Sequence, residues 1–164
     1  MGHVLIAWYP TVRLPAMKLQ SEATISKLAA NRLGVLREVY IRTWGKAELV
    51  PQVSWLHEPI ADNRAQPFVA IVDEKLVGCV VPVIKPDTGE GVLSKGVHVL
   101  PAFQRRRIGT SLLMIALEWF REMAVDKAWV WPWNPNGAAE TAAAERFYLA
   151  NGGTIIEDTK QKVP

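Results

Sequence analysis

Cysteine is almost absent from this chain of 164 residues, and that scarcity excludes several classes of protein. The single copy, Cys79, cannot form a disulfide within the chain, so the sequence is not that of a disulfide-stapled scaffold. No Cys/His cluster has the spacing of zinc ligands, and we expect no metal site. Because Cys79 stands in the apolar run LVGCVVPVI, we expect it to be a buried hydrophobic side chain and not a nucleophile.

Long apolar runs and a strong charge of one sign are also missing. The apolar patch at 4–8 is far shorter than the roughly 20 residues of a membrane span. It has no basic region before it and no small-residue cleavage site after it. The net charge of +3 is too small to indicate a general nucleic-acid-binding protein. We therefore expect a cytoplasmic protein that binds neither membranes nor nucleic acids.

The rest of the composition is typical of a globular protein. Hydrophobic residues make up 49% of the chain and charged residues 21%, which argues against disorder. The sequence contains no repeat, no low-complexity tract and no obvious linker, and its length suits one well-buried domain. We expect a single domain over residues 1–164.

Hydrophobic periodicity predicts strands and helices in a definite order. Strands are expected at 4–9, 67–72, 75–84, 92–100, 128–133 and 154–159. Helices are expected at 21–33, 35–44, 108–124 and 140–150, and 52–58 could be another short helix. A crossover helix between two central strands predicts a parallel pair inside an otherwise antiparallel sheet. The expected fold class is therefore α/β (α+β), with a mixed, mainly antiparallel sheet.

The strongest functional signal is a run of three arginines, Arg105 to Arg107, directly before the most apolar helix. Cations at a helix N-terminus oppose the macrodipole, so this placement costs stability unless an anion belongs there. Unpaired backbone N–H groups at the helix start, with Gly109 allowing close approach, are typical of a phosphate site. Two alternatives stay open: a solvated basic turn, or arginines paired with distant carboxylates.

Two short motifs resemble the GNAT superfamily of N-acetyltransferases over about residues 68–154, the expected coenzyme-binding core. The first reads VLP at 99–101 and QRRRIGT at 104–110, similar to the family's V-x-P strand end and its Q/R-x-x-G-x-G/A loop. The second, AERFYLANGG at 144–153, contains Ala144, Tyr148 and Gly152 at the spacing of the family's A-x-x-x-Y-x-x-x-G helix. Both motifs flank a strand–helix–strand unit in the family's order.

Three positions depart from the family pattern. Arg107 stands where the family usually has its first glycine, which is tolerable if the backbone there is ordinary helical. Thr141 is nearest to a position that is often asparagine, and Asn134 or Asn136 in the preceding loop could substitute for it. Gly153 replaces the usual phenylalanine.

The resemblance implies an enzyme that moves an acetyl group from acetyl-CoA to a primary amine, with no metal and with helices on both faces of the sheet. It assigns the coenzyme pyrophosphate to the loop residues Gln104, Arg105, Arg106, Arg107, Ile108, Gly109 and Thr110. It assigns Val97, His98 and Val99 to the strand whose backbone N–H polarises the thioester carbonyl. Tyr148 takes the family's general-acid position, protonating the departing thiolate.

The residues do not identify the general base. His98 lies on the correct strand, but period-two alternation sets it on the face opposite Val97 and Val99. Glu90 is on the same approach but in a turn. The remaining candidate is water acting as the proton relay, with His98 as a packed or surface residue.

The residues do not identify the acceptor either, and small amines, amino acids, peptide N-termini and aminoglycoside-like compounds all stay open. Trp129, Trp131 and Trp133 alternate, so we expect them to share one sheet face and pack in the core. An aromatic acceptor pocket or a dimer surface is the alternative. A silent acyl-CoA-binding regulatory module is the competing function, followed by a nucleic-acid-binding protein that uses Arg105 to Arg107.

The C-terminal sequence raises the question of what covers the last strand. The family usually adds a hairpin and a further strand, whereas only KQKVP follows 154–159 in this sequence. An uncovered sheet edge is a liability. We expect cover either from the N-terminal strand at 4–9 or from a second subunit, and we favour a homodimer because the N-terminal strand is needed as the first strand of the sheet.

Overall fold

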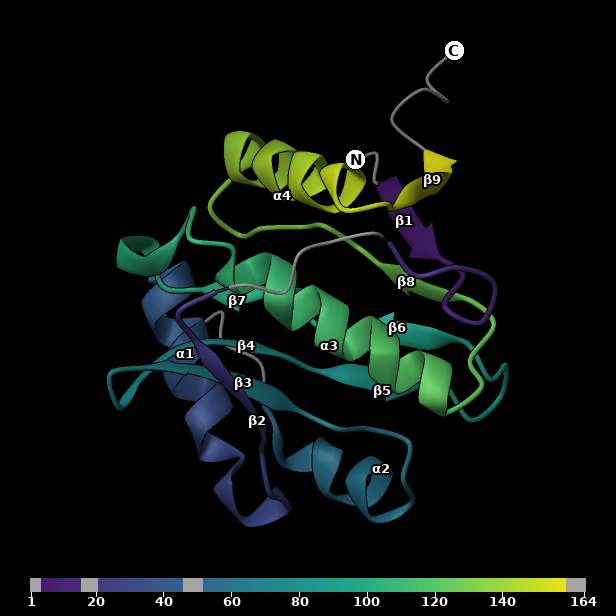
Figure 1. Cartoon of the computed structure of the whole chain (residues 1–164), viewed down its shortest axis with the longest axis horizontal. Helices are drawn as coiled ribbons and strands as arrows, with labels where there is room; N and C mark the ends of the chain where they lie inside the picture. Colours follow the sequence, from purple (N-terminus) through teal and green to yellow (C-terminus); the bar gives the residue numbers. More distant parts are fainter. Residues whose placement is uncertain (1–3, 16–20, 46–51, 159–164) are drawn as a thin grey trace.

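The computed structural model describes residues 4–15, 21–45 and 52–158 (Figure 1). Its helices are α1 Gly34–Trp44, α2 His57–Ala61, α3 Ile108–Glu122 and α4 Ala138–Ala150. Its strands are β1 Val4–Trp8, β2 Thr24–Lys27, β3 Phe68–Val72, β4 Lys75–Val80, β5 Pro82–Ile84, β6 Gly91–Leu93, β7 His98–Val99, β8 Ala128–Val130 and β9 Thr154–Asp158. Short 3-10 turns lie at Ala30–Arg32, Ser54–Leu56 and Pro101–Phe103.

The strands form two hydrogen-bonded sheets, and the chain crosses between them four times. One sheet has the order β2-β3-β4-β7, and the other has the order β5-β6-β8-β1-β9. All described pairs are antiparallel except β6 with β8. The predicted fold class, a mainly antiparallel arrangement with one parallel pair, is confirmed.

Two predicted strands are each divided between the sheets. The stretch predicted as 75–84 becomes β4 and β5, and the stretch predicted as 92–100 becomes β6 and β7. Lys95 and Gly96 have left-handed backbones, with φ of 63° and 77°, and these angles turn the chain out of the sheet that contains β6 and into the sheet that contains β7. Gly96 lies in a tight turn, in which its N–H donates to the Leu93 carbonyl.

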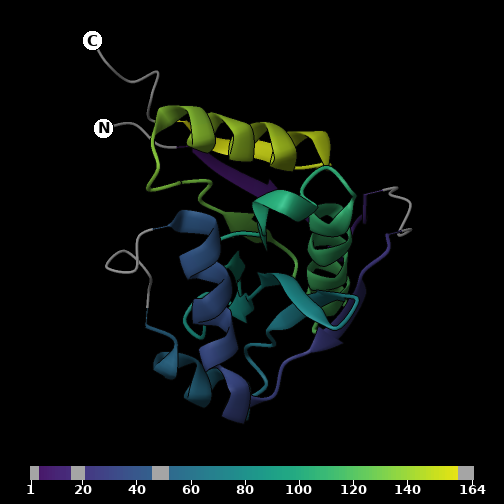
Figure 2. The same cartoon turned by 90° about the vertical axis from the view of Figure 1, so that its left-hand side faces the viewer.

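Helices cover both faces of the strands, as expected (Figure 2). On one face α3 and α4 pack on a core that includes Ile6, Val80 and Val130, and on the other α1 packs on Val69, Cys79 and Val81. Cys79 is fully buried, in agreement with its expected packing role. Within the described parts of the chain, none of the helices combines the length and the apolar character needed to cross a membrane.

The predicted helix at 21–33 is wrong. Residues Thr24–Lys27 form β2, which pairs with β3 along its length. The hydroxyl of Ser21 accepts the N–H of Ala23 two residues on, which is a turn contact and not a helix cap. Apolar spacing favoured a helix, but pairing with the otherwise open edge of β3 decides the local structure. The predicted helix at 52–58 is found as the 3-10 turn Ser54–Leu56 and α2.

The strand β1 lies between β8 and β9 and pairs with both. The N-terminal strand therefore covers one edge of β9, the first of the two expected kinds of cover. A second subunit was preferred because the N-terminal strand was expected to be needed as the first strand of the sheet. That argument does not hold, because β1 pairs with β8 and with β9 at once. The homodimer itself stays a prediction.

Gly153 allows β1 to approach the end of α4 closely. A Cβ at this position would collide with the side chain of Ile6 and lie 2.9 Å from the carbonyl oxygen of Tyr148 and 3.0 Å from Trp8. The absence of a side chain, where the family usually has phenylalanine, makes room for β1.

We expect Gly153→Ala to lower the free energy of unfolding by about 1–3 kcal/mol, because backbone and core atoms must shift. Gly34→Ala is the matched control, since nothing lies within 4 Å of a Cβ there. Urea denaturation of both variants measures the difference. Equal stability of the two variants would contradict the packing of β1 described here.

Candidate active site

A cavity of about 110 Å³ opens where β7 diverges from the segment that follows β8. Its lining comes from α1, the turn before β7, β7 itself, the segment after β8, and α4. The lining residues are Thr43, Trp44, Lys95, Gly96, Val97, His98, Val99, Gln104, Trp131, Pro132, Trp133, Asn134, Ala144 and Tyr148. The predicted strand 97–99 and the predicted acid Tyr148, which are far apart in sequence, are therefore brought together.

The hydroxyl of Tyr148 accepts the backbone N–H of Val97 at 2.9 Å. The ring is buried and meets Trp8 edge-on, with centroids 5.8 Å apart. Burial raises the pKa of Tyr148 to about 12, although the hydrogen bond from Val97 opposes that shift. The phenol thus keeps its proton at neutral pH, and its O–H is a donor placed on the cavity wall.

Gly96 makes this contact possible. It has a left-handed backbone, and a Cβ there would lie 2.5 Å from the Tyr148 hydroxyl oxygen. A larger residue would therefore be strained and would displace the phenol.

His98 points away from the cavity centre into the face covered by α1. Its Nε2 lies 2.6 Å from the Lys95 carbonyl oxygen, and its Nδ1 lies 3.0 Å from Oγ1 of Thr43. A carbonyl only accepts, so Nε2 carries the proton and Nδ1 accepts from the threonine. The rings of Tyr40 and Trp44 meet the imidazole edge-on.

These contacts hold His98 neutral and fully engaged. Burial lowers its pKa to about 4, against the opposing effect of the hydrogen bond to Lys95. The alternation predicted for this strand is confirmed, since Val97 and Val99 pack toward the opposite core. A histidine with both nitrogens occupied is poorly suited to take a proton from a substrate, and its geometry is that of a brace for the 95–97 turn.

One edge of β7 faces the cavity without a neighbouring strand. The other edge pairs with β4. On the cavity side Val97 donates to Tyr148, and the Val99 carbonyl accepts from Nε2 of Gln104 at 3.1 Å. Because only side chains fill these positions, an extended amide chain could replace them and pair with the strand.

The arginine run forms a loop with an alternating backbone. Arg105 and Arg107 have φ of 63° and 65°, whereas Arg106 is not among the residues with positive φ. Such alternation gathers successive N–H groups into an anion-binding concavity. Arg107 was expected to be tolerable in place of the family's glycine if its backbone were ordinary helical, and the backbone is not. Arg107 is the N-cap of α3 and lies in the left-handed region, which a glycine would adopt freely.

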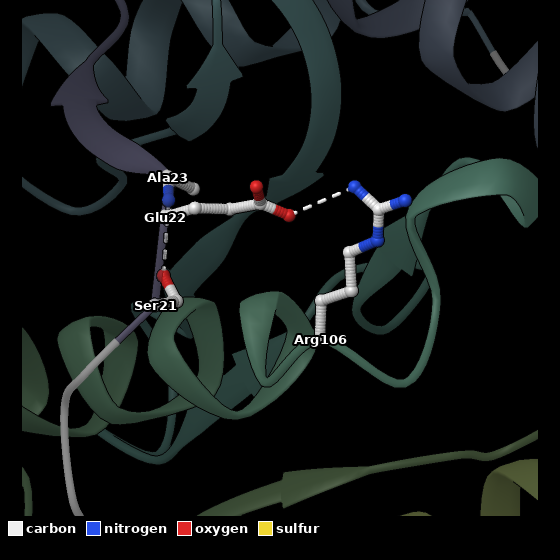
Figure 3. A network of polar contacts seen from close by, with 4 residues as sticks. All are labelled: Ser21, Glu22, Ala23 and Arg106. Carbon is white, nitrogen blue, oxygen red and sulfur yellow. Dashed lines mark hydrogen bonds and ion pairs between the residues drawn. The ribbon is translucent and has the colours of Figure 1, made fainter.

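Arg106 forms an ion pair with Glu22 at 2.9 Å (Figure 3). Its guanidinium also lies 5.1 Å from the ring centroid of Phe103. The alternative of arginines paired with distant carboxylates is thus found for one of the three. Both partners are about half exposed, so the pair contributes little and an anionic ligand can compete with it. Within the described ranges no ion pair is found for Arg105 or Arg107.

The first turn of α3 is tied to α4. Ile108 is buried, and the Thr110 hydroxyl donates to Oδ1 of Asn151 at 3.2 Å. A Cβ on Gly109 would lie 3.3 Å from the Phe147 ring, so this glycine has a packing role that the sequence did not indicate. The arginine loop and the helix that carries Tyr148 are therefore held together.

Asn134 is the loop asparagine that reaches the cavity wall. Thr141, at the position compared with the family's asparagine, accepts the Asn134 N–H at 3.1 Å. Asn136 lies in the turn, where its N–H donates to Oδ1 of Asn134. Of the two candidate substitutes, Asn134 alone lines the cavity.

Sequence reasoning missed part of the cavity wall. Thr43 and Trp44 were assigned only to a helix face, and Trp131 and Trp133 were expected in the core. Trp131 and Trp133 are instead 51% and 44% exposed, because the strand ends at Val130 and a tight turn follows. The signal available in the sequence for this aromatic surface was the spacing of the tryptophans at every second residue, 129, 131 and 133.

No cluster of three or more His, Cys, Asp or Glu side chains suited to a metal ion lies among the residues that the structure describes.

We expect the stability of the protein to fall on acidification because of His98. The unfolded histidine titrates near pH 6.5, whereas the folded one titrates near 4, so between these values the unfolded state binds more protons. The free energy of unfolding should fall by roughly 3 kcal/mol as the pH drops from 7 to 4. In His98→Gln this part of the slope should disappear. Equal slopes in urea titrations would show that His98 is not held neutral.

We also expect Arg107→Gly to be at least about 1 kcal/mol more stable than Arg106→Gly. Glycine relieves a left-handed backbone only at position 107, and the two changes remove the same charge. Thermal and urea unfolding of the pair measures the difference. A less stable Arg107→Gly variant would contradict the strained loop.

Comparison with known proteins identifies the family and the fold of the chain. A model of the acetyltransferase (GNAT) family matches residues 34–152. No curated protein matches the chain significantly.

Solved structures give the same fold. A GCN5-related N-acetyltransferase from Kribbella flavida has a TM-score of 0.67 at 15% identity, covering 96% of this chain, which spans 56% of that protein. AAC(6')-Iy, bound to the bisubstrate analogue CoA-S-monomethyl-acetylneamine, gives 0.61 at 18% identity and 80% and 90% coverage. The ribosomal-protein-S18-alanine N-acetyltransferase of Escherichia coli gives 0.57 at 22% identity and 79% and 76% coverage. With the family model matching well over half of its length, the chain belongs to the GNAT family of acetyltransferases.

Proposed function

We propose that this protein transfers the acetyl group of acetyl-CoA directly to a primary amine. The observation that carries the proposal is the meeting of the Val97 N–H and the Tyr148 hydroxyl in one cavity. One is a fixed main-chain donor, and the other is a buried phenol that keeps its proton. In acyl transfer, negative charge develops on the thioester oxygen and on the departing sulfur. The N–H can stabilise the charge on the oxygen, and the phenol can protonate the sulfur.

The coenzyme would bind along the path from the arginine loop to the cavity. The N–H groups of the loop and the side chains of Arg105 to Arg107 suit a pyrophosphate. The open edge of β7 suits the amide groups of the pantetheine arm, which can replace the Gln104 contact to the Val99 carbonyl. This path leads the thioester to Val97 and Tyr148.

The transfer needs few groups from the protein. The amine nitrogen attacks the thioester carbonyl carbon, a C–N bond forms, and the C–S bond breaks. The Val97 N–H exchanges the Tyr148 hydroxyl for the thioester carbonyl oxygen as its acceptor, and Tyr148 donates its proton to the departing sulfur. Because both nitrogens of His98 are engaged, the proton lost by the amine passes to water, and solvent protonates Tyr148 again.

We expect Tyr148→Phe to lower kcat on the order of a hundredfold, with little change in coenzyme affinity. Release of the CoA thiol from acetyl-CoA with a panel of primary amines measures the rate, and calorimetry measures the affinity. Tyr9→Phe is the control, because Tyr9 is 43% exposed and does not line the cavity. With a pKa near 12, Tyr148 should cause no loss of rate between pH 8 and 10.

Two results would contradict this proposal in different ways. Near-normal turnover by Tyr148→Phe would make water the proton donor. Tight binding of acetyl-CoA by the wild-type protein without turnover of any amine would favour an acyl-CoA-binding regulatory module.

A further inference from the structure

Two tryptophan side chains lie at the mouth of the cavity. Trp131 and Trp133, called the aromatic rim below, stack with ring centroids 5.7 Å apart and planes 27° apart. They line the cavity and leave 51% and 44% of their surfaces exposed. Large aromatic side chains usually bury most of their surface, so a stacked, half-exposed pair beside a cavity is typical of a ligand-binding surface.

The aromatic rim is held in position from below. Trp133 meets Trp44 edge-on at 6.3 Å, and Trp44 is only 4% exposed. Trp44 in turn meets His98 at 5.3 Å. This continuous row of rings fixes the rim before any ligand binds, which reduces the entropy cost of binding.

The third tryptophan of the series is used differently. The indole N–H of Trp129 donates to a carboxylate oxygen of Glu90 at 2.9 Å, and Nζ of Lys85 lies 5.9 Å from its ring. Trp129 lines a separate pocket, together with Trp55. The cavity mouth is therefore served by Trp131 and Trp133.

The charge around the cavity restricts the acceptor. Of the described residues that line it, Lys95 is the only charged one, and none is acidic. An amine with several positive charges would be repelled by Lys95 and would find no carboxylate among the described residues of the lining. A single ammonium group can instead be attracted to the faces of the indole rings.

The size of the cavity restricts the acceptor as well. About 110 Å³ holds a small number of heavy atoms, such as the acetyl thioester end and the attacking amine. The remainder of the acceptor must lie outside the cavity, on the aromatic rim.

Building on the proposed function, we propose that the acceptor is a primary amine with one positive charge, joined by a short chain to an aromatic or bulky apolar group. The amine enters the cavity toward Val97 and Tyr148. The apolar group stacks on Trp131 and Trp133. Polyamines and aminoglycosides, which carry several positive charges, are expected to be poorer acceptors.

Matched acceptors test this inference. With acetyl-CoA, 2-phenylethylamine and tryptamine should show kcat/KM at least tenfold above 1,5-diaminopentane and kanamycin. A preference for the polycations would overturn the inference and leave the acetyltransferase proposal standing. Failure of every amine would overturn both.

Variants of the aromatic rim should change the KM for the amine and leave kcat nearly unchanged, a pattern that a general loss of activity would not produce. Trp131→Ala and Trp133→Ala should raise KM for 2-phenylethylamine about tenfold with kcat changed less than threefold, while KM for acetyl-CoA stays the same. Trp55→Ala is the matched control, because Trp55 is 48% exposed but lies in the separate pocket. Circular dichroism confirms that each variant is folded. An unchanged amine KM in both rim variants would overturn the inference.

Discussion

The separation of the two sheets at the 95–97 turn is the constraint on which the active site depends. Lys95 and Gly96 must both adopt left-handed backbones for the chain to leave β6 and enter β7. The hydrogen bond from His98 to the Lys95 carbonyl holds this turn, and Thr43 of α1 holds His98. The same turn aims the Val97 N–H at Tyr148 and opens the space beside β8. His98 thus affects the candidate site through the backbone geometry of this turn.

The local motifs of the site could be predicted from the sequence, because each depends on neighbouring residues. The arginine loop, the strand before it and the helix carrying Tyr148 were all found by short spacing patterns, and the structure brings them together. The pattern could not reveal the left-handed backbone at Arg107, since a non-glycine residue adopts it only when the surrounding structure demands it. It also could not reveal that Gly109 faces Phe147 of a distant helix.

The errors in the fold prediction have one physical origin, which is long-range pairing. Thr24–Lys27 has the apolar spacing of a helix but becomes a strand because β3 offers an unpaired edge. The stretches 75–84 and 92–100 each look like one strand, yet each serves two sheets. The prediction of the fold class was nevertheless correct, because it depends on the order of the more strongly predicted helices and strands.

The position of β1 has a consequence for how the molecule folds. The first of the described strands, β1, lies between β8 and β9, and its Val4 pairs with Asp158. A ribosome must therefore deliver nearly the whole described chain before the five-stranded sheet can close. Pairing across such sequence separation is slow, because the loop-closure entropy is lost before the contacts form. During that interval the apolar β1 segment has no partner strand and is exposed to aggregation. A chaperone that shields extended apolar segments would protect it until β8 and β9 are made.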